Sequence, residues 1–238
     1  KKEHLLLKIY HSLQQHWLIQ KVKGEYKTFG QVASSILASA VREGDHSSRI
    51  DIVFDVYKDH SIKAAERHNR TTDFAVHYKN IVSGQLVWQW RRFLQSTENK
   101  TSLIEFLVKK WTKAENIAQI LENTELVVAS GVKCWKITKE GKKEIPDLEA
   151  QHEEADTRLA LHAAHAAKAG KQSVIIIISE DTDVFLICLA HCSMIGVPIF
   201  QKTGPWTRTQ FVDISRLAQI YGDGVWKAIF GLHAFTGC

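Results

Sequence analysis

Four acidic side chains have the types and the spacing that metal-assisted chemistry requires. Glu154 and Asp156 stand two positions apart, and Asp181 and Asp183 repeat that spacing about two dozen residues later. Mg²⁺ and other hard divalent cations prefer oxygen ligands, which carboxylates supply. Carboxylates that gather at one point repel each other unless cations offset their charge or some of them stay protonated. The two pairs together therefore predict a cation site.

Each pair also has a purely structural interpretation. The helix macrodipole favours acids at helix N-termini, so Glu154 and Asp156 can serve as helix-start residues, with Glu154 paired to Arg158 four positions on. Asp181 and Asp183 can belong to a polar turn. These alternatives stay open at this stage, and the combination of the two pairs is what favours the cation site.

The elements around these acids predict an α/β protein. Short apolar runs predict strands at 50–54, 126–129, 173–178 and 197–200. Helical patterns predict helices at 61–69, 101–123, 152–169 and 212–220. The segment 184–189 fits either a strand or the start of a helix, and 139–146 is predicted to be a polar loop. Alternating strands and helices predict a three-layer α/β/α fold with a mostly parallel central sheet, formed by residues 1–238 as one domain. Ligand sites of such sheets lie beyond the carboxyl ends of the strands, which is where Asp55 and the segment 179–183 are expected.

The charge distribution favours a polyanionic partner. The segment from Glu144 to Asp183 holds nine acidic and three basic residues, a net charge of −6, whereas the remaining 28 basic and 17 acidic residues give +11. An acidic island inside a basic protein fits a chain that binds nucleic acid and holds cations at one point.

A basic helix face is predicted shortly after Asp55. Lys63, Arg67 and Arg70 are spaced by four and three residues, which places them on one side of a helix. Basic groups beside a carboxylate cluster suit phosphodiester cleavage, since the bases hold the backbone and the acids hold metal ions. A solvated helix face is the competing interpretation.

Other candidate residues favour structural roles. We expect packing rather than base stacking for the tryptophan–arginine run at 88–93, and local hydrogen bonding or surface placement for His162 and His165. The four cysteines form no disulfide framework and no recognised zinc spacing, so we expect small buried side chains in a reducing, intracellular setting. No apolar run reaches the length of about 18 residues that a membrane span needs, and no signal peptide is present, so we expect no membrane partner.

The acidic strings at 153–158 and 179–183 resemble the internal region of flap endonucleases, members of the wider PIN-like nucleases. In that family a Glu-Ala-Glu helix entry precedes an apolar strand and a Glu-Asp-x-Asp turn, so Glu154 and Asp156 match the first pair and Asp181 and Asp183 the second. Val53-Phe54-Asp55 is similar to the family's Val-Phe-Asp strand end. From about residue 25 onward the chain looks closest to a group of animal proteins, often found near transposon-derived sequence, that carry His-Glu-Glu-Ala-Asp-Thr-Arg, Asp-Thr-Asp-Val and His-Ala-Phe-Thr-Gly-Cys-Asp.

The resemblance implies a metal-dependent nuclease that cleaves phosphodiester bonds of DNA or RNA. It implies two Mg²⁺ or Mn²⁺ ions held by carboxylates, and basic residues that neutralise the scissile phosphate. The matching carboxylates are Asp55, Glu154, Asp156, Asp181 and Asp183, and the matching basic residues are Lys63 and Arg67.

The chain also departs from the family's pattern. The family's first Asp, on an N-terminal strand, has no match, since Asp45 lies in a polar stretch, and the last Asp would follow Cys238, so we expect a fragment cut at both ends. No counterpart of the DNA-binding arch is present, and the preference for flaps is not carried over. Two alternatives remain. One is a degenerate PIN-like module that binds nucleic acid or protein without cutting. The other is a Rossmann-like protein with a small-molecule site, although this chain lacks the Gly-rich fingerprint of such proteins.

Overall fold

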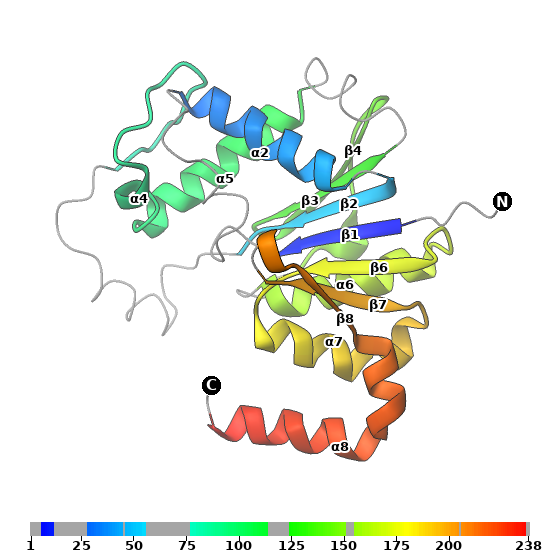
Figure 1. The fold of residues 1–238 in the computed structure, drawn as a ribbon. Helices are drawn as coiled ribbons and strands as arrows, with labels where there is room; N and C mark the ends of the chain where they lie inside the picture. Colours follow the sequence, from blue (N-terminus) through cyan, green and yellow to red (C-terminus); the bar gives the residue numbers. More distant parts are fainter. Residues whose placement is uncertain are drawn as a thin grey trace.

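The computed structural model describes residues 6–11, 28–44, 46–55, 77–113, 124–150, 155–204 and 206–236 of the 238-residue chain (Figure 1). The strands are β1 (Leu6–His11), β2 (Ser47–Val53), β3 (Glu125–Ser130), β4 (Lys133–Thr138), β5 (Gly141–Glu144), β6 (Val174–Ile178), β7 (Ile199–Thr203) and β8 (Gln210–Asp213). The helices are α2 (Phe29–Glu43), α4 (Trp90–Phe93), α5 (Thr97–Trp111), α6 (Ala155–Lys168), α7 (Thr182–Ile195) and α8 (Ile214–Thr236), with 3₁₀ turns η2 (Pro146–Leu148) and η3 (Trp206–Arg208).

All eight strands form one mixed sheet in the order β5-β4-β3-β2-β1-β6-β7-β8. The five central strands, from β3 to β7 in that order, run parallel. β4, β5 and β8 add antiparallel pairs at the two edges. The predicted α/β class with a mostly parallel central sheet is therefore confirmed.

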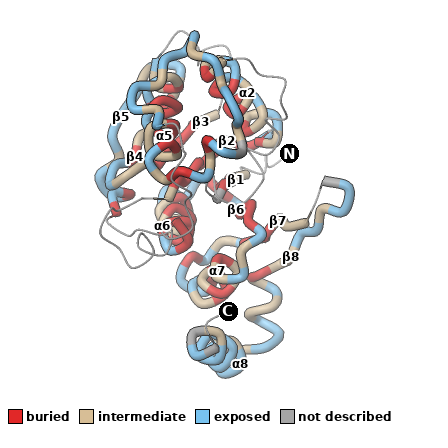
Figure 2. Tube along the Cα trace, turned by 90° about the vertical axis from the view of Figure 1, so that its left-hand side faces the viewer, coloured by how far each residue is buried: buried red, intermediate tan, exposed pale blue. Residues whose placement is uncertain are grey.

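The sheet is covered on both faces, which gives the predicted three layers (Figures 1 and 2). On one face, Ile50, Ile52 and Leu126 pack against α2 and α5, around the fully buried Trp111. On the other face, Ile9 and Ile177 pack with neighbouring apolar residues against α6 and α7. Because successive side chains of a strand point to opposite faces, β1, β2, β3 and β6 each contribute to both cores.

Several elements follow the sequence pattern closely. The apolar run of β6 is a strand covered on both faces, and α6 ends before Gly170, whose positive φ of 67° suits a glycine at a helix C-terminus. The ambiguous segment 184–189 is helical and lies in the first half of α7. The predicted strands at 50–54, 126–129 and 197–200 correspond to β2, β3 and β7, and the prediction of a helix over 101–123 is confirmed as far as Trp111.

Two predictions are wrong. The segment 139–146 is not a loop, because it contains β5, an exposed edge strand rich in lysine that pairs with β4. Polar edge strands protect a sheet from pairing with other chains, and they lack the apolar alternation that sequence reading relies on. The helix expected at 212–220 begins at Ile214, after β8, and continues to Thr236.

The N-terminal part holds two elements that the sequence pattern did not predict. β1 lies at the centre of the sheet, between β2 and β6, and α2 follows with a capping box formed by Thr28 and Gln31. The segment 88–93 contributes α4, whose Phe93 is buried against Phe29, so the packing interpretation of this run is supported there. The predicted helix at 61–69 and the segment 114–123 lie outside the described residues.

Candidate functional site

The candidate acids follow two strands whose carboxyl ends share one edge of the sheet. Asp55 comes two residues after β2, and Asp181 and Asp183 come shortly after β6. β1 lies between β2 and β6, and all three strands are parallel. Their arrowheads point to the same side in Figure 1, so the fold places both groups of acids at the edge where the rule for parallel sheets expects a site.

Asp55 lies at the start of α6. Its Oδ1 accepts a hydrogen bond of 3.3 Å from the backbone N–H of Ala155, the first residue of that helix. A carboxylate at a helix N-terminus satisfies a free amide and interacts favourably with the helix dipole. Asp156 follows in the same first turn and is 8% exposed. Asp55 and Asp156, 101 positions apart in the chain, thus belong to one corner of the fold.

Asp156 also acts electrostatically on α7. Burial, together with the nearby Cys192 and Asp156, raises the pKa of the Cys188 thiol to about 12. Cys188 belongs to α7, the helix that carries Asp183 and that packs against α6. A thiol with a pKa raised this far is protonated at neutral pH, which agrees with the prediction of Cys188 as a small buried side chain.

Asp181 and Asp183 form the N-terminus of α7. Asp181 is the N-cap residue, and its Oδ1 accepts from the backbone N–H of Asp183 at 2.8 Å. The loop before the cap is held by Gln201 of β7, whose side-chain N–H donates to the carbonyl oxygens of Ser179 at 2.9 Å and Asp181 at 3.3 Å. Gln201 is 4% exposed, so a buried amide anchors the loop that presents both acids. Asp181 therefore has a structural role as a helix cap, in a loop that also presents Asp183.

His233 is a site residue that the sequence reading did not single out. It lies in the last turn of α8, and its Nε2 contacts Asp183 Oδ1 across 50 positions of the chain. The available signal was its place in the His-Ala-Phe-Thr-Gly-Cys string at the end of the chain. The contact brings a third helix, α8, to the candidate site.

The described carboxylates are chemically suited to bind a hard divalent cation, because each supplies oxygen ligands at one edge of the sheet. As arranged, the part of the chain that the structure describes contains no group of three or more His, Cys, Asp or Glu side chains that could hold a metal ion. Glu154, Lys63 and Arg67 lie outside the described residues, so the full predicted set cannot be assembled from the described part alone. Asp55, Asp156, Asp181 and Asp183 are the members that the structure describes.

Arg158 does not serve as an exposed surface partner. Its guanidinium donates to the carbonyl oxygens of Gly131, Val132, Lys133 and Leu148 at distances between 2.6 and 3.2 Å. The side chain is 1% exposed, so it ties α6 to the β3–β4 turn and to η2. This role positions the helix whose first turn carries Asp156.

The two histidines of α6 take part in a buried ionic network away from the strand ends. Asp51 of β2 accepts two hydrogen bonds from Arg49, at 2.6 and 2.7 Å, and a third from His162 Nδ1 at 2.6 Å. His165 Nδ1 lies 3.1 Å from the Arg49 guanidinium, so it accepts from it. Of the sequence-based alternatives for the two histidines, surface placement is wrong for His162, which is fully buried.

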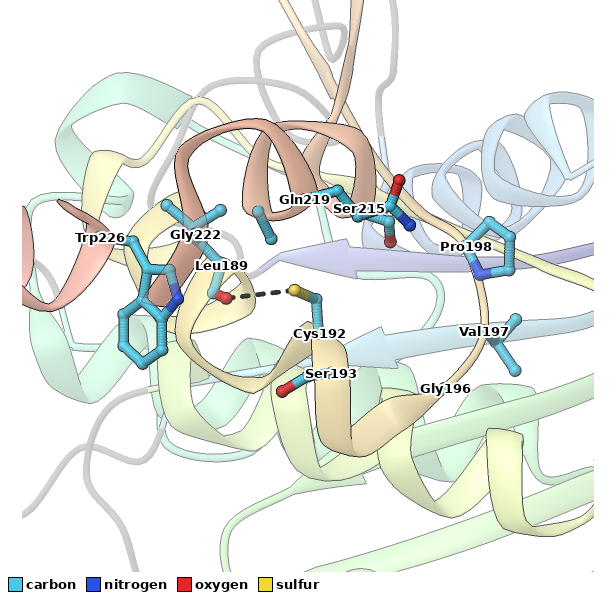
Figure 3. A pocket seen from close by; sticks show the side chains of 11 residues that line it. Leu189, Cys192, Ser193, Gly196, Val197, Pro198, Ser215, Gln219, Gly222 and Trp226 are labelled. Carbon is cyan, nitrogen blue, oxygen red and sulfur yellow. Dashed lines mark hydrogen bonds between the residues drawn. The ribbon is translucent and has the colours of Figure 1, made fainter. Parts of the chain in front are cut away.

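A pocket of about 510 Å³ opens between α7 and the first part of α8 (Figure 3). Its walls include Leu189, Pro198 and Trp226, and Cys192 donates from its thiol to the Leu189 carbonyl. The pocket adjoins the C-terminal half of α7, whereas Asp181 and Asp183 occupy the opposite end of that helix. It is therefore separate from the candidate site and marks a loosely packed junction beside the kink of α8 at Gly222.

Comparison of the chain with protein-family models, with curated proteins and with solved structures finds no match. Within the described ranges, no helix combines the length and the apolar character needed to cross a bilayer.

Proposed function

We propose that the chain is a divalent-metal-dependent nuclease domain, with a PIN-like fold related to flap endonucleases, that cleaves phosphodiester bonds of nucleic acid. The observation that carries the proposal is the meeting of Asp55 with the first turn of α6, beside Asp156, at the same sheet edge as Asp181 and Asp183. Acids separated by 100 positions or more are brought to one corner of a basic protein.

The proposed roles of the residues follow from their charge and position. Asp55, Glu154, Asp156, Asp181 and Asp183 would hold Mg²⁺ or Mn²⁺, two ions in the arrangement that the resemblance implies. Bound cations of this kind lower the pKa of a coordinated water and offset negative charge on the scissile phosphate. Lys63 and Arg67 would orient that phosphate and neutralise it. The net charge of +5 favours the approach of a polyanion.

The experiment that tests the proposal measures cleavage and cation binding on the same preparations. Labelled single-stranded and double-stranded DNA and RNA are incubated with the chain in Mn²⁺ or Mg²⁺, beside the Asp183→Asn variant. We expect cleavage that requires the cation, is abolished by EDTA and falls at least about 100-fold in the variant, since loss of one group that supports electrostatic stabilisation of the transition state typically costs about that much. An Asp213→Asn variant, altered at an acid of β8 away from the described site residues, serves as the control.

Full cleavage by Asp183→Asn, or cleavage that is insensitive to EDTA, would contradict the assignment. Asp183→Asn keeps the size of the side chain, and its circular dichroism and melting temperature show whether the fold is intact.

A catalytically degenerate binding module is the second candidate. Such a module would bind nucleic acid with an affinity that depends on salt but not on EDTA, and Asp183→Asn would bind as tightly as the wild type. Absence of cleavage together with this binding behaviour would favour the module over the nuclease.

A further inference from the structure

His233 is turned inward on a helix segment whose apolar side chains face outward. The side chain of His233 is 20% exposed, whereas its neighbours Leu232 and Phe235 are 62% and 90% exposed. Burying apolar area is worth about 25 cal/mol per Å², so apolar contact alone would turn those neighbours toward the protein instead. The polar contact with Asp183 accounts for the orientation of the imidazole.

The change of direction in α8 places His233 beside the candidate site. At Gly222 the backbone takes φ 68° and ψ 169°, which breaks the helix and redirects its second part. That part runs back along α7 to the side where the parallel strands end (Figure 1). Near the start of this second part, Trp226 is half-buried beside the pocket of Figure 3 and packs against the core. His233 follows two turns later and reaches Asp183.

The contact orients one oxygen of the carboxylate. A carboxylate oxygen only accepts hydrogen bonds, so His233 Nε2 carries the hydrogen and donates it to Oδ1. Oδ2 of the same group is then held in a defined direction. Asp183 is 46% exposed, and without such a donor a carboxylate at that exposure would sample several rotamers.

We propose that His233 is a positioning residue for Asp183, a role that rests on the proposed function of the carboxylates as cation ligands. The imidazole acts through the carboxylate and does not itself ligate the cation. Outer partners of this kind fix ligand orientation, and their loss typically costs about 10–100-fold in metal affinity.

The test is a titration with Mn²⁺ alone, in which binding is measured by electron paramagnetic resonance as the loss of the signal of free Mn²⁺. The proteins are the full chain, His233→Ala, His233→Gln and the control His191→Ala. His191 is an exposed histidine of α7 that makes a hydrogen bond to Ile187 of the same helix. We expect affinity to fall by about 10–100-fold in His233→Ala, to recover in His233→Gln because its amide N–H also donates, and to stay unchanged in the control. Recovery by Gln is a result that a purely structural role of the ring would not produce.

Three results separate the possible failures. Wild-type affinity in His233→Ala overturns the positioning role while leaving the proposed function intact. A ¹⁴N coupling in the pulsed spectrum of bound Mn²⁺ that disappears in His233→Ala shows direct ligation and also overturns it. If the wild type binds no Mn²⁺, or if Asp181→Asn/Asp183→Asn binds it as well as the wild type, the proposed function fails and this role falls with it.

Discussion

Asp51 of β2 and His162 of α6 share a hydrogen bond of 2.6 Å between Oδ2 and Nδ1, and both side chains are fully buried. Arg49 also pairs with Asp51, and although burial opposes ionisation, this guanidinium and the His162 hydrogen bond hold the pKa of the Asp51 carboxyl below its usual value. The negative charge of Asp51 is thus already compensated. Burial lowers the pKa of His162, and its Nε2 has no hydrogen-bond partner among the described residues, which suits a neutral imidazole.

The lowered pKa of His162 predicts a pH-dependent stability. In the unfolded chain this histidine takes up a proton near pH 6.5, whereas in the native protein it resists protonation. The contribution is therefore complete above about pH 6.5 and is lost as the pH falls toward the native pKa. We expect the free energy of unfolding to decrease between pH 7.5 and 5.5, by at most about 1.4 kcal/mol per pH unit for this one proton.

Urea unfolding at pH 7.5, 6.5 and 5.5 checks this prediction. His162→Gln removes the titrating group, so the slope of stability against pH should become shallower than in the wild type. The exposed His191 provides the control, because His191→Gln should leave the slope unchanged. Equal slopes in the wild type and His162→Gln would contradict the neutral assignment.

Arg158 is predicted to stabilise the fold rather than the chemistry. Arg158→Met keeps an unbranched side chain but leaves four carbonyl oxygens without this donor. A buried acceptor left unpaired costs about 1–3 kcal/mol, and some of the four will find water, so we expect a loss of about 2–4 kcal/mol in unfolding free energy. The exposed Arg216→Met on α8 should change stability by less than about 0.5 kcal/mol, and a similar small change in Arg158→Met would disprove the prediction.

Two substitutions at Asp181 are expected to separate its roles as a helix cap and as a cation ligand. Asparagine caps helices about as well as aspartate, whereas alanine loses about 1 kcal/mol. Asp181→Asn should therefore keep the wild-type melting temperature, and Asp181→Ala should lower it. Both should bind Mn²⁺ much more weakly than the wild type, as measured by calorimetry. Unweakened binding by Asp181→Asn would leave this residue with its capping role alone.

Gly222 is predicted to be a position that only glycine fits well. Its φ of 68° and ψ of 169° lie in a region that other residues enter at a cost of about 1–3 kcal/mol. No atom lies within 4 Å of an added Cβ there, so the cost of Gly222→Ala would come from the backbone and not from a clash.

Thermal unfolding of Gly222→Ala beside Gly224→Ala tests this. Gly224 also has open space around its Cα and no positive φ, so alanine there should be neutral or stabilising by up to about 1 kcal/mol. We also expect Gly222→Ala to weaken Mn²⁺ binding, because a changed kink moves His233 away from Asp183. Equal stability of the two variants would refute the strain argument.

The amino-acid sequence alone was sufficient to predict the elements whose signal is local. The run of isoleucines in β6 and the alanine-rich α6 with Gly170 behind it specify their conformations through neighbouring residues. The acids of the candidate site were also visible as residue types, and their order after two strands followed from the alternation of strands and helices. The sequence pattern did not predict β5, because a lysine-rich edge strand has no alternation of apolar and polar residues.

Only the tertiary structure decided which of these residues meet. The contacts that define the site and its supports join Asp55 to Ala155 across 100 positions, Asp51 to His162 across 111 and Asp183 to His233 across 50. Local backbone geometry places side chains only within a segment. Which residues this far apart come into contact depends on the strand order, on the packing of helices on the two faces of the sheet and on the pairing of buried charges. Those terms depend on the whole chain at once, which is why the inward turn of His233 and the burial of His162 are properties of the fold.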